Sequence, residues 1–271
     1  MLPGDPSIPP PQQHNRRAWD ARVSENRTFT RPATDQQFAH PLETVDPSNW
    51  LGGNIRGWRV LCLAAGGGSA GPLYAAAGAI VTVVDISPAM LALDHRVAAE
   101  RDLELRTVET SMDDLSMFAP GEFDLVVQPV STCYVPDVAK VYAQVARVVR
   151  AGGLYVSQHK QPASLQADVR PSPRGYELIE PYYRTGPLPP VAGSRHREEG
   201  TLEYLHRWEQ LVGELCRSGF VVEDLVEPLH ADDRAPLGTF AHRSRYTSPY
   251  VRIKARRAAP ITNSRLALPT K

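Results

Sequence analysis

The stretch that most constrains this chain runs from Val60 to Asp85 and reads VLCLAAGGGSAGPLYAAAGAIVTVVD. An apolar run is followed by glycines, then by a small-residue segment, and then by a second apolar run that ends on an acid. Gly66, Gly68 and Gly71 fit the pattern G-x-G-x-x-G, and Asp85 lies 19 residues beyond Gly66. Glycines permit a tight turn and a close approach of backbone N–H groups to a ligand, while an acid after the second strand can accept hydrogen bonds from ribose. The stretch therefore predicts a strand–turn–helix–strand unit that binds an adenosine-containing cofactor.

Further apolar runs continue this alternation of strands and helices along the chain. Strands are expected at 59–64, 80–84, 104–109, 123–128 and 153–158, and helices at 70–77, 88–101 and 137–149. Apolar strands separated by helices are typical of a parallel sheet that is covered on both faces. An amphipathic helix is expected at 205–219, before two more strands in FVVEDLVE and PYVRIKARR. Its inward residues would be Leu205, Trp208, Leu211, Leu215 and Cys216.

The remaining segments frame this α/β region. The Pro-rich residues 1–13 are expected to be a disordered arm, because they carry too few apolar side chains to form a core. Residues 14–57 are expected to hold an N-terminal helix and a lid segment. The main domain would span 58–257, with an insertion at 160–204 on the substrate side, and 258–271 would be a flexible tail.

Composition narrows the classes of function. Thirty Lys and Arg residues balance thirty Asp and Glu residues, which argues against a general binder of polyanions, although no acid follows Asp233. We therefore expect no nucleic-acid partner. Cys62, Cys133 and Cys216 show no CxxC spacing, so neither a metal site nor a disulfide framework is expected. No apolar run approaches the roughly 18 residues of a membrane span, and we expect a cytoplasmic protein with no membrane partner.

Four later segments follow the glycine turn in order: DISPAML, SMDDL, FDLVVQPVS and RVVRAGGLYVS. This succession resembles the class I S-adenosylmethionine-dependent methyltransferases over about residues 58–256. The resemblance implies an α/β, Rossmann-like fold with a seven-stranded, mostly parallel sheet in the order 3-2-1-4-5-7-6 and helices on both faces. It implies S-adenosyl-L-methionine as the cofactor and S-adenosyl-L-homocysteine as the product.

The resemblance also implies which residues hold the cofactor. The methionine end would be lined by Ala64, Ala65, Gly66 and Gly68. Asp85 would bind the ribose diol, with Ile86 and Met90 beside the adenine. The adenine would be covered by Ser111, Met112 and Asp113, and the sulfonium would be faced by Gln128, Pro129 and Val130. The carboxylate of Asp113 would accept from the exocyclic amine of the adenine.

The chain departs from the family pattern at Cys62, where the family often has an acid, and at the alanines 64 and 65. Another group must therefore hold the amino-acid end of the cofactor. The N-terminal helix and the stretch after it offer Trp19, Arg22 and Arg31 as candidates. The alternative is that Trp19 only packs the helix against the domain.

Methyl transfer is an in-line displacement on an activated donor, so the protein mainly supplies alignment and exclusion of water. A general base is needed only where the acceptor arrives protonated. His159, at the end of the fifth strand, is the candidate base because its unperturbed pKa is about 6.5. The alternative is a histidine that binds loop backbone. Tyr134 in QPVSTCYVPD is the second catalytic candidate, and His and Tyr side chains in the later loops could contact the acceptor.

The leading hypothesis is transfer of a methyl group to O or N of a small organic acceptor. A nicotinamide-dependent oxidoreductase would use the same crevice for adenosine, but would not require the segments DISPAML and SMDD. A non-catalytic S-adenosylmethionine-binding protein is a further alternative, and RNA methylation is indicated only by the basic C-terminal strand. The identity of the acceptor and the oligomeric state, monomer or homodimer, are left open.

Overall fold

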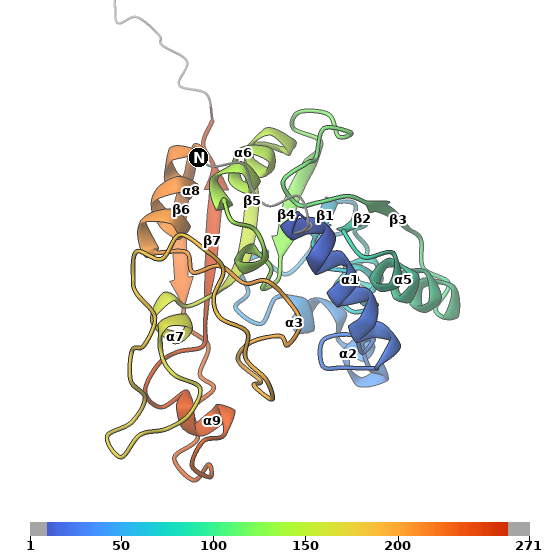
Figure 1. The fold of residues 1–271 in the computed structure, drawn as a ribbon. Coiled ribbons are helices and arrows are strands. Elements are labelled where there is room, and N and C mark those ends of the chain that lie inside the picture. Colours follow the sequence, from blue (N-terminus) through green and yellow to red (C-terminus); the bar gives the residue numbers. More distant parts are fainter. Residues whose placement is uncertain (1–9, 260–271) are drawn as a thin grey trace, which may run out of the picture.

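One seven-stranded sheet organises residues 10–259, the part of the chain that this computed structural model describes (Figure 1). Its strands follow the order β3-β2-β1-β4-β5-β7-β6, as the resemblance implies. The five strands from β3 to β5 are parallel, and β7 runs antiparallel to both of its neighbours. The strands are β1 (Arg59–Leu63), β2 (Ile80–Asp85), β3 (Leu105–Glu109), β4 (Phe123–Gln128), β5 (Val149–Lys160), β6 (Phe220–Val226) and β7 (Tyr250–Arg257).

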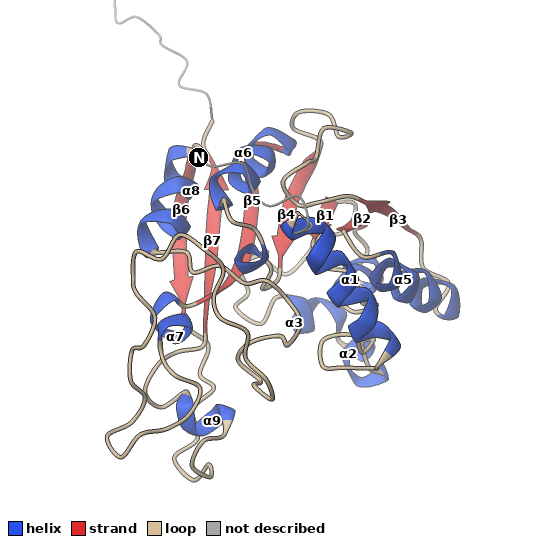
Figure 2. Ribbon diagram, viewed as in Figure 1, coloured by secondary structure: helices blue, strands red, loops and turns tan. Residues whose placement is uncertain are grey.

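Helices flank this sheet (Figure 2). They are α1 (Pro11–Ser24), α2 (Asp35–Ala39), α3 (Pro41–Val45), α4 (Ala70–Ala76), α5 (Pro88–Glu100), α6 (Val138–Val148), α7 (Pro162–Gln166), α8 (Glu214–Arg217) and α9 (Phe240–Arg243), with a 3-10 turn η1 (Thr132–Tyr134) and a π-helical turn η2 (Glu209–Gly213). Among the residues from 10 to 259, no helix has the length and apolar character needed to cross a bilayer.

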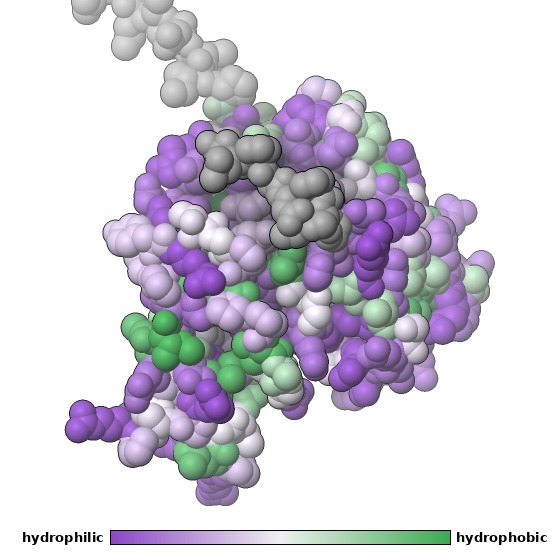
Figure 3. All heavy atoms as spheres, viewed as in Figure 1, coloured by the Kyte–Doolittle hydropathy of each residue, from purple (hydrophilic) through white to green (hydrophobic). Residues whose placement is uncertain are grey.

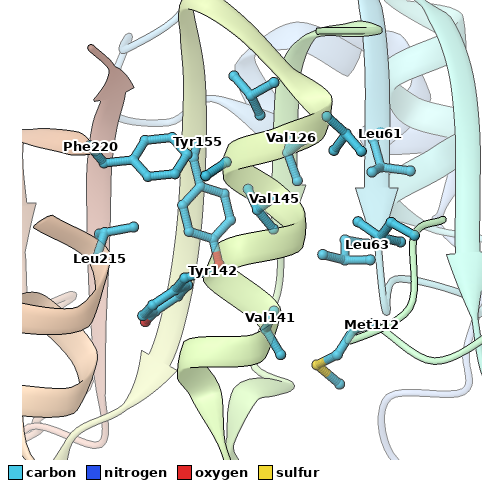
Figure 4. Packing of buried hydrophobic residues seen from close by; sticks show 14 of the residues in the cluster. Leu61, Leu63, Met112, Val126, Val141, Tyr142, Val145, Tyr155, Leu215 and Phe220 are labelled. Carbon is cyan, nitrogen blue, oxygen red and sulfur yellow. The ribbon is translucent and has the colours of Figure 1, made fainter. Parts of the chain in front are cut away.

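The side chains of the central strands alternate between two hydrophobic cores, one on each face of the sheet. Leu61 and Leu63 of β1 point to the face covered by α6 and α8, and Val60 and Cys62 point to the opposite face, which α4 and α5 cover. Figure 4 shows the first core, where Val141, Tyr142 and Val145 of α6 lie over Val126 and Tyr155 of the sheet. Each such buried side chain contributes about 1.5–3 kcal/mol, so both faces fix the position of the strand ends.

Local signals in the sequence place α5 directly after β2. Pro88 occupies the first turn, where its missing N–H costs nothing, and the Ser87 hydroxyl accepts a hydrogen bond from Met90 N–H at 3.1 Å. The helix therefore starts three residues after Asp85 and brings its first turn beside the glycine loop.

The long connections gather at the carboxyl ends of the parallel strands. The loops that follow α7 and β6 lie on that side, and α1 packs across it against α5 and η1 (Figure 1). Apolar residues reach the surface of this loop-rich half (Figure 3), including Leu178, Leu229 and Leu237. Helix α1 belongs to the predicted lid segment 14–57 and much of the loop after α7 to the predicted insertion 160–204, whereas the loop after β6 lies outside both.

Two predicted boundaries need correction. Helix α1 begins at Pro11, so residues 11–13 are helical, whereas residues 1–9 of the predicted disordered arm and 260–271 of the predicted tail lie outside the described residues. The helix predicted at 205–219 starts only at Trp208 and opens with a π turn, in which Glu214 N–H donates to Glu209 C=O. Leu211 and Leu215 are buried as predicted, but Cys216, the next residue around the helix, is exposed. Leu205 packs instead in a separate small cluster.

Candidate active site

The glycine turn after β1 has little space for side chains. A Cβ atom at Gly66 would lie 2.8 Å from Met90 Cβ, and one at Gly71 would lie 2.4 Å from Val83 Cγ2. Ala64, which starts the turn, has a φ of 49° and so adopts a left-handed conformation that costs a residue with a Cβ about 1–2 kcal/mol. Close packing fixes the path of the turn.

Asp85 holds this turn from the end of β2. Its Oδ2 accepts a hydrogen bond from Gly66 N–H and its Oδ1 accepts one from Ser87 N–H, both at 2.9 Å. Burial raises the pKa of the Asp85 carboxyl to about 6, although these backbone donors partly offset the shift. A carboxylate can accept about four hydrogen bonds, so the side chain keeps acceptor capacity for a ribose hydroxyl.

A second acid, Asp94, supports the turn from α5 and was missed by the sequence reasoning. The side chain is fully buried, and its Oδ2 accepts from Gly67 N–H at 2.9 Å. Burial raises the pKa of Asp94 to about 7. Cys62, at the position where the family often has an acid, is buried in the apolar core nearby. The sequence signal that could have identified Asp94 was an acidic residue on the inward face of the helix predicted at 88–101.

A cavity of about 520 Å³ opens at the carboxyl ends of the strands, within the usual range for small-molecule sites. Asp85 ends β2 and Tyr250 begins β7, and both line this cavity. Four strand spacings of about 4.8 Å separate β2 from β7, so the cavity spans about 19 Å along the edge of the sheet. It is long enough to hold a nucleoside cofactor beside a second molecule.

Most of the predicted site residues line this cavity. They are Trp19, Arg31, Ala64, Ala65, Gly66, Asp85, Ile86, Met90, Ser111, Met112, Pro129, Val130 and Tyr134. Asp85 is placed for a ribose, and the apolar Ile86, Met90 and Met112 are placed for a planar base. These residues fit S-adenosylmethionine.

Five predicted residues do not line the cavity, and three of them support the wall from behind. A Cβ at Gly68 would meet Val97 Cγ2 at 2.9 Å, so this glycine serves the packing of the turn against α5. The Gln128 amide donates to Ser131 Oγ at 2.9 Å and to Met112 Sδ at 3.3 Å, and thereby fixes two lining residues.

Asp113 is the third of these supporting residues. It accepts from Ser111 Oγ and, at 3.3 Å, from the Gln12 amide of α1. Its oxygens therefore tie α1 to the segment after β3, and the structure does not bring them into the cavity wall.

Of the three N-terminal candidates for binding the amino-acid end of the cofactor, Trp19 and Arg31 line the cavity and Arg22 does not. Arg22 donates to the carbonyl oxygens of Thr28 at 3.2 Å and Glu199 at 3.3 Å, so it holds the lid together. Trp19 lines the cavity and also packs edge-on against Tyr134, with ring centroids 5.8 Å apart. Arg31 lines it too, as the one arginine or lysine among the described lining residues.

Helix α1 is fastened over the cavity by Asn15, which the sequence reasoning did not single out. Its amide nitrogen donates to the carbonyls of Tyr134 at 3.0 Å and Leu202 at 3.1 Å, while its oxygen accepts from Leu202 N–H at 2.7 Å. Asn15 and Gln12 both line the cavity.

The prediction of a base at His159 is corrected by the structure. The ring is fully buried, with Nδ1 2.8 Å from Thr132 Oγ1 and Nε2 2.7 Å from Ser157 Oγ. Burial lowers the pKa of His159 to about 3. Because side chains alternate along a strand, the neighbouring Gln158 lines the cavity instead.

At the β5 and β7 end of the cavity, Tyr134 donates its hydroxyl to Glu198 Oε2 at 2.8 Å. Lys160 Nζ contacts both Glu198 and Glu203, and Arg197 contacts Glu203. Burial raises the pKa of the Glu198 carboxyl, but the Lys160 ammonium and the hydrogen bonds from Glu203, Lys160 and Tyr134 together lower it, so the net shift is downward. Burial raises the pKa of the Tyr134 hydroxyl far above its usual range. Both groups therefore keep their ordinary charge at neutral pH.

The loop residues expected near the acceptor are mostly elsewhere. His230 lines the cavity, with its ring 5.4 Å from that of Tyr250. The His206 ring is buried instead beside the carbonyl oxygens of Thr132 and Val135. Tyr183 is exposed. The 198–203 segment carried no periodic signal that could have placed it at the site.

Known proteins resemble this chain in sequence and fold. A family model described as a methyltransferase domain matches residues 61–157. The uncharacterized methyltransferase YbaJ of Bacillus subtilis is 34% identical over 230 residues, which cover 79% of this chain and 89% of the relative. An S-adenosylmethionine-dependent methyltransferase from Mesorhizobium loti is 22% identical, with a TM-score of 0.61 over 81% of this chain and 100% of that one.

A second solved structure, geranyl diphosphate C-methyltransferase from Streptomyces coelicolor A3(2), contains S-adenosyl-L-homocysteine. It is 16% identical, with a TM-score of 0.60 over 93% of this chain and 99% of that one. The likeness to YbaJ extends through most of both chains and agrees with the sheet order and with a cavity suited to adenosine. The chain therefore belongs to the class I S-adenosylmethionine-dependent methyltransferases, with S-adenosylmethionine as its cofactor.

Proposed function

We propose that the protein transfers the methyl group of S-adenosylmethionine to an oxygen or nitrogen atom of a small organic molecule. The observation that carries this proposal is the single cavity that joins the Asp85 end to the Tyr250 end. The part between β2 and β4 suits the cofactor, and the part between β4 and β7 is left for the acceptor.

Asp85 would bind the ribose diol through its free lone pairs, and Met112 would cover the adenine. Arg31 would bind the carboxylate of the methionine moiety, because it is the arginine that the described cavity wall provides. Hydrogen bonds between ionised partners are shorter and about twice as strong as neutral ones.

The bound cofactor supplies an activated methyl group: a lone pair of the acceptor forms the new bond to the methyl carbon, the carbon–sulfur electrons remain on sulfur, and a proton on the acceptor is lost to water. The protein contributes alignment, which can account for about 7–11 kcal/mol in well-oriented reactions. Asn15 holds α1 over the cavity, and Trp19 and Phe29 add apolar wall that excludes water.

A small acceptor is favoured by the character of the remaining wall. The side chains of Phe29, Val130, Val135 and Tyr250 line it together with a few polar groups. A confined apolar wall with a few fixed polar groups is typical of small-molecule sites.

Binding and turnover test this proposal separately. Calorimetry should detect binding of S-adenosylhomocysteine and not of NAD⁺, and Arg31→Ala should weaken that binding about tenfold. Incubation with labelled S-adenosylmethionine and pooled phenols, alcohols and amines should give labelled small products. Label that appears only on RNA or protein would contradict the proposed acceptor class. Failure to bind S-adenosylhomocysteine would contradict the cofactor site.

A further inference from the structure

Glu198 is a charged cavity residue to which the cofactor assigns no role. Its side chain is only 5% exposed, yet it lines the cavity. Tyr134 and Lys160 both bind its Oε2. Among residues 10–259, no backbone, amine, amide or hydroxyl group donates a hydrogen bond to its Oε1, and the Glu203 carboxyl lies within hydrogen-bonding reach of the Glu198 carboxyl.

The charges behind Glu198 balance one another. Lys160 and Arg197 are paired with Glu198 and Glu203 in a chain of contacts that runs from Glu198 through Lys160 and Glu203 to Arg197, and burial raises the pKa of the Glu203 carboxyl. Of these four side chains, only Glu198 lines the cavity. The cluster therefore needs no further anion, and the atom it presents to a ligand is a carboxylate oxygen.

An anionic ligand would meet this oxygen in a site that supplies no second cation, since Arg31 is engaged by the cofactor in the proposed function. Two like charges brought together out of water repel strongly. A ligand with an N–H or O–H group would instead fill the vacant lone pairs of Oε1, and a protonated amine would form the stronger bond.

Resting on the proposed function, we propose that Glu198 is the binding group for the acceptor. The acceptor is a small, apolar or aromatic molecule that donates an N–H or O–H hydrogen bond and carries no carboxylate or phosphate. The aromatic rings of His230 and Tyr250 flank its position. Glu198 orients the acceptor in this scheme and takes no proton.

Two probes of matched shape and opposite charge test the proposal: tyramine, which is cationic, and 4-hydroxyphenylacetate, which is anionic. Binding to the protein saturated with S-adenosylhomocysteine would be measured by ligand-observed NMR. We expect tyramine to bind at least tenfold more tightly. Equal affinities, tighter binding of the anion, or binding of neither probe would overturn the proposal, and this comparison needs no variant.

Glu198→Gln keeps the shape of the side chain and removes its charge. It should reduce the preference for tyramine to about twofold or less, and an unchanged preference would overturn the proposal. Glu199→Gln is the matched control, because Glu199 is the exposed neighbour in sequence, and it should leave the preference as in the wild type.

The affinity for S-adenosylhomocysteine separates the two proposals. Tight binding of this product without a preference for the cationic probe would refute the acceptor class alone. Absence of product binding in the wild type would refute the proposed function itself.

Discussion

Lowering the pH from 7 to 5 should weaken the binding of S-adenosylhomocysteine about tenfold, because Asp85 must be ionised to accept hydrogen bonds from both ribose hydroxyls. Burial raises the pKa of this carboxyl to about 6. A group with that pKa is about nine-tenths ionised at pH 7 and about one-tenth ionised at pH 5. The protonated acid keeps one acceptor position fewer and loses the charge-assisted bond.

The same shift has an opposite consequence for the stability of the ligand-free protein. The pKa rises from 3.8 in the unfolded chain to about 6 in the folded one, which corresponds to about 3 kcal/mol. Since the folded state favours the protonated acid, this contribution is fully present below pH 3.8 and is lost as the pH rises through 6. At neutral pH the ionised carboxylate is therefore a cost to folding that a bound ribose offsets.

Isothermal titration calorimetry between pH 5 and 8, or quenching of Trp19 in the cavity wall, would measure the affinity. Asp85→Asn should bind about 1–3 kcal/mol more weakly and show a clearly smaller dependence on pH between 5 and 7, the remainder coming from Asp94, whose pKa is raised to about 7. Asp102→Asn, a change at an exposed position, should behave as the wild type. An affinity of the wild type that is constant from pH 5 to 8 would refute the reasoning, as would a pH dependence of undiminished size in Asp85→Asn.

Three further predictions follow from the contacts around the site. His159→Ala should lower the free energy of unfolding by about 2–4 kcal/mol, since it leaves a cavity and removes the hydrogen-bond partner of Thr132 and Ser157. Urea unfolding measures this change. The affinity for S-adenosylhomocysteine should stay within twofold of the wild type. Asn15→Ala should speed dissociation of S-adenosylhomocysteine at least fivefold in stopped-flow fluorescence, because α1 loses three hydrogen bonds, and an unchanged rate would show that α1 does not gate release. Ala64→Gly should raise the melting temperature or leave it unchanged. The substitution relieves the left-handed strain at φ 49°, and this gain outweighs or equals the roughly 0.5–1 kcal/mol entropic cost of glycine. A clear fall in melting temperature would contradict the assignment of strain.

The cofactor half of the site was predictable because it is local in sequence. The turn at Gly66, the acid at Asp85 and the segment at Met112 each follow a strand at a fixed distance, and parallel strands bring their carboxyl ends to the same edge. The apolar runs of β1, β2 and β4 were also visible, and the sheet order, which the resemblance to the family implied, is confirmed.

The acceptor half depended on register and on contacts between distant segments. A displacement of one residue along β5 decides whether His159 or Gln158 reaches the cavity. The end of this strand reads SQHK, and such a polar sequence has no apolar alternation from which the register could be inferred. Glu198 lies in a Pro- and Gly-rich stretch without periodicity, and only its contacts with Lys160 and Tyr134 bring it to the wall.

The amino-acid sequence by itself determined the fold and the place of the nucleoside, because hydrophobic periodicity and the glycine turn are properties of short segments. Only the tertiary structure decided which side chains face the acceptor, because burial, charge pairing and the seating of α1 by Asn15 arise where segments nearly 190 residues apart meet. The physical reason is that a cavity wall is made by long-range packing, which no single stretch of the chain encodes.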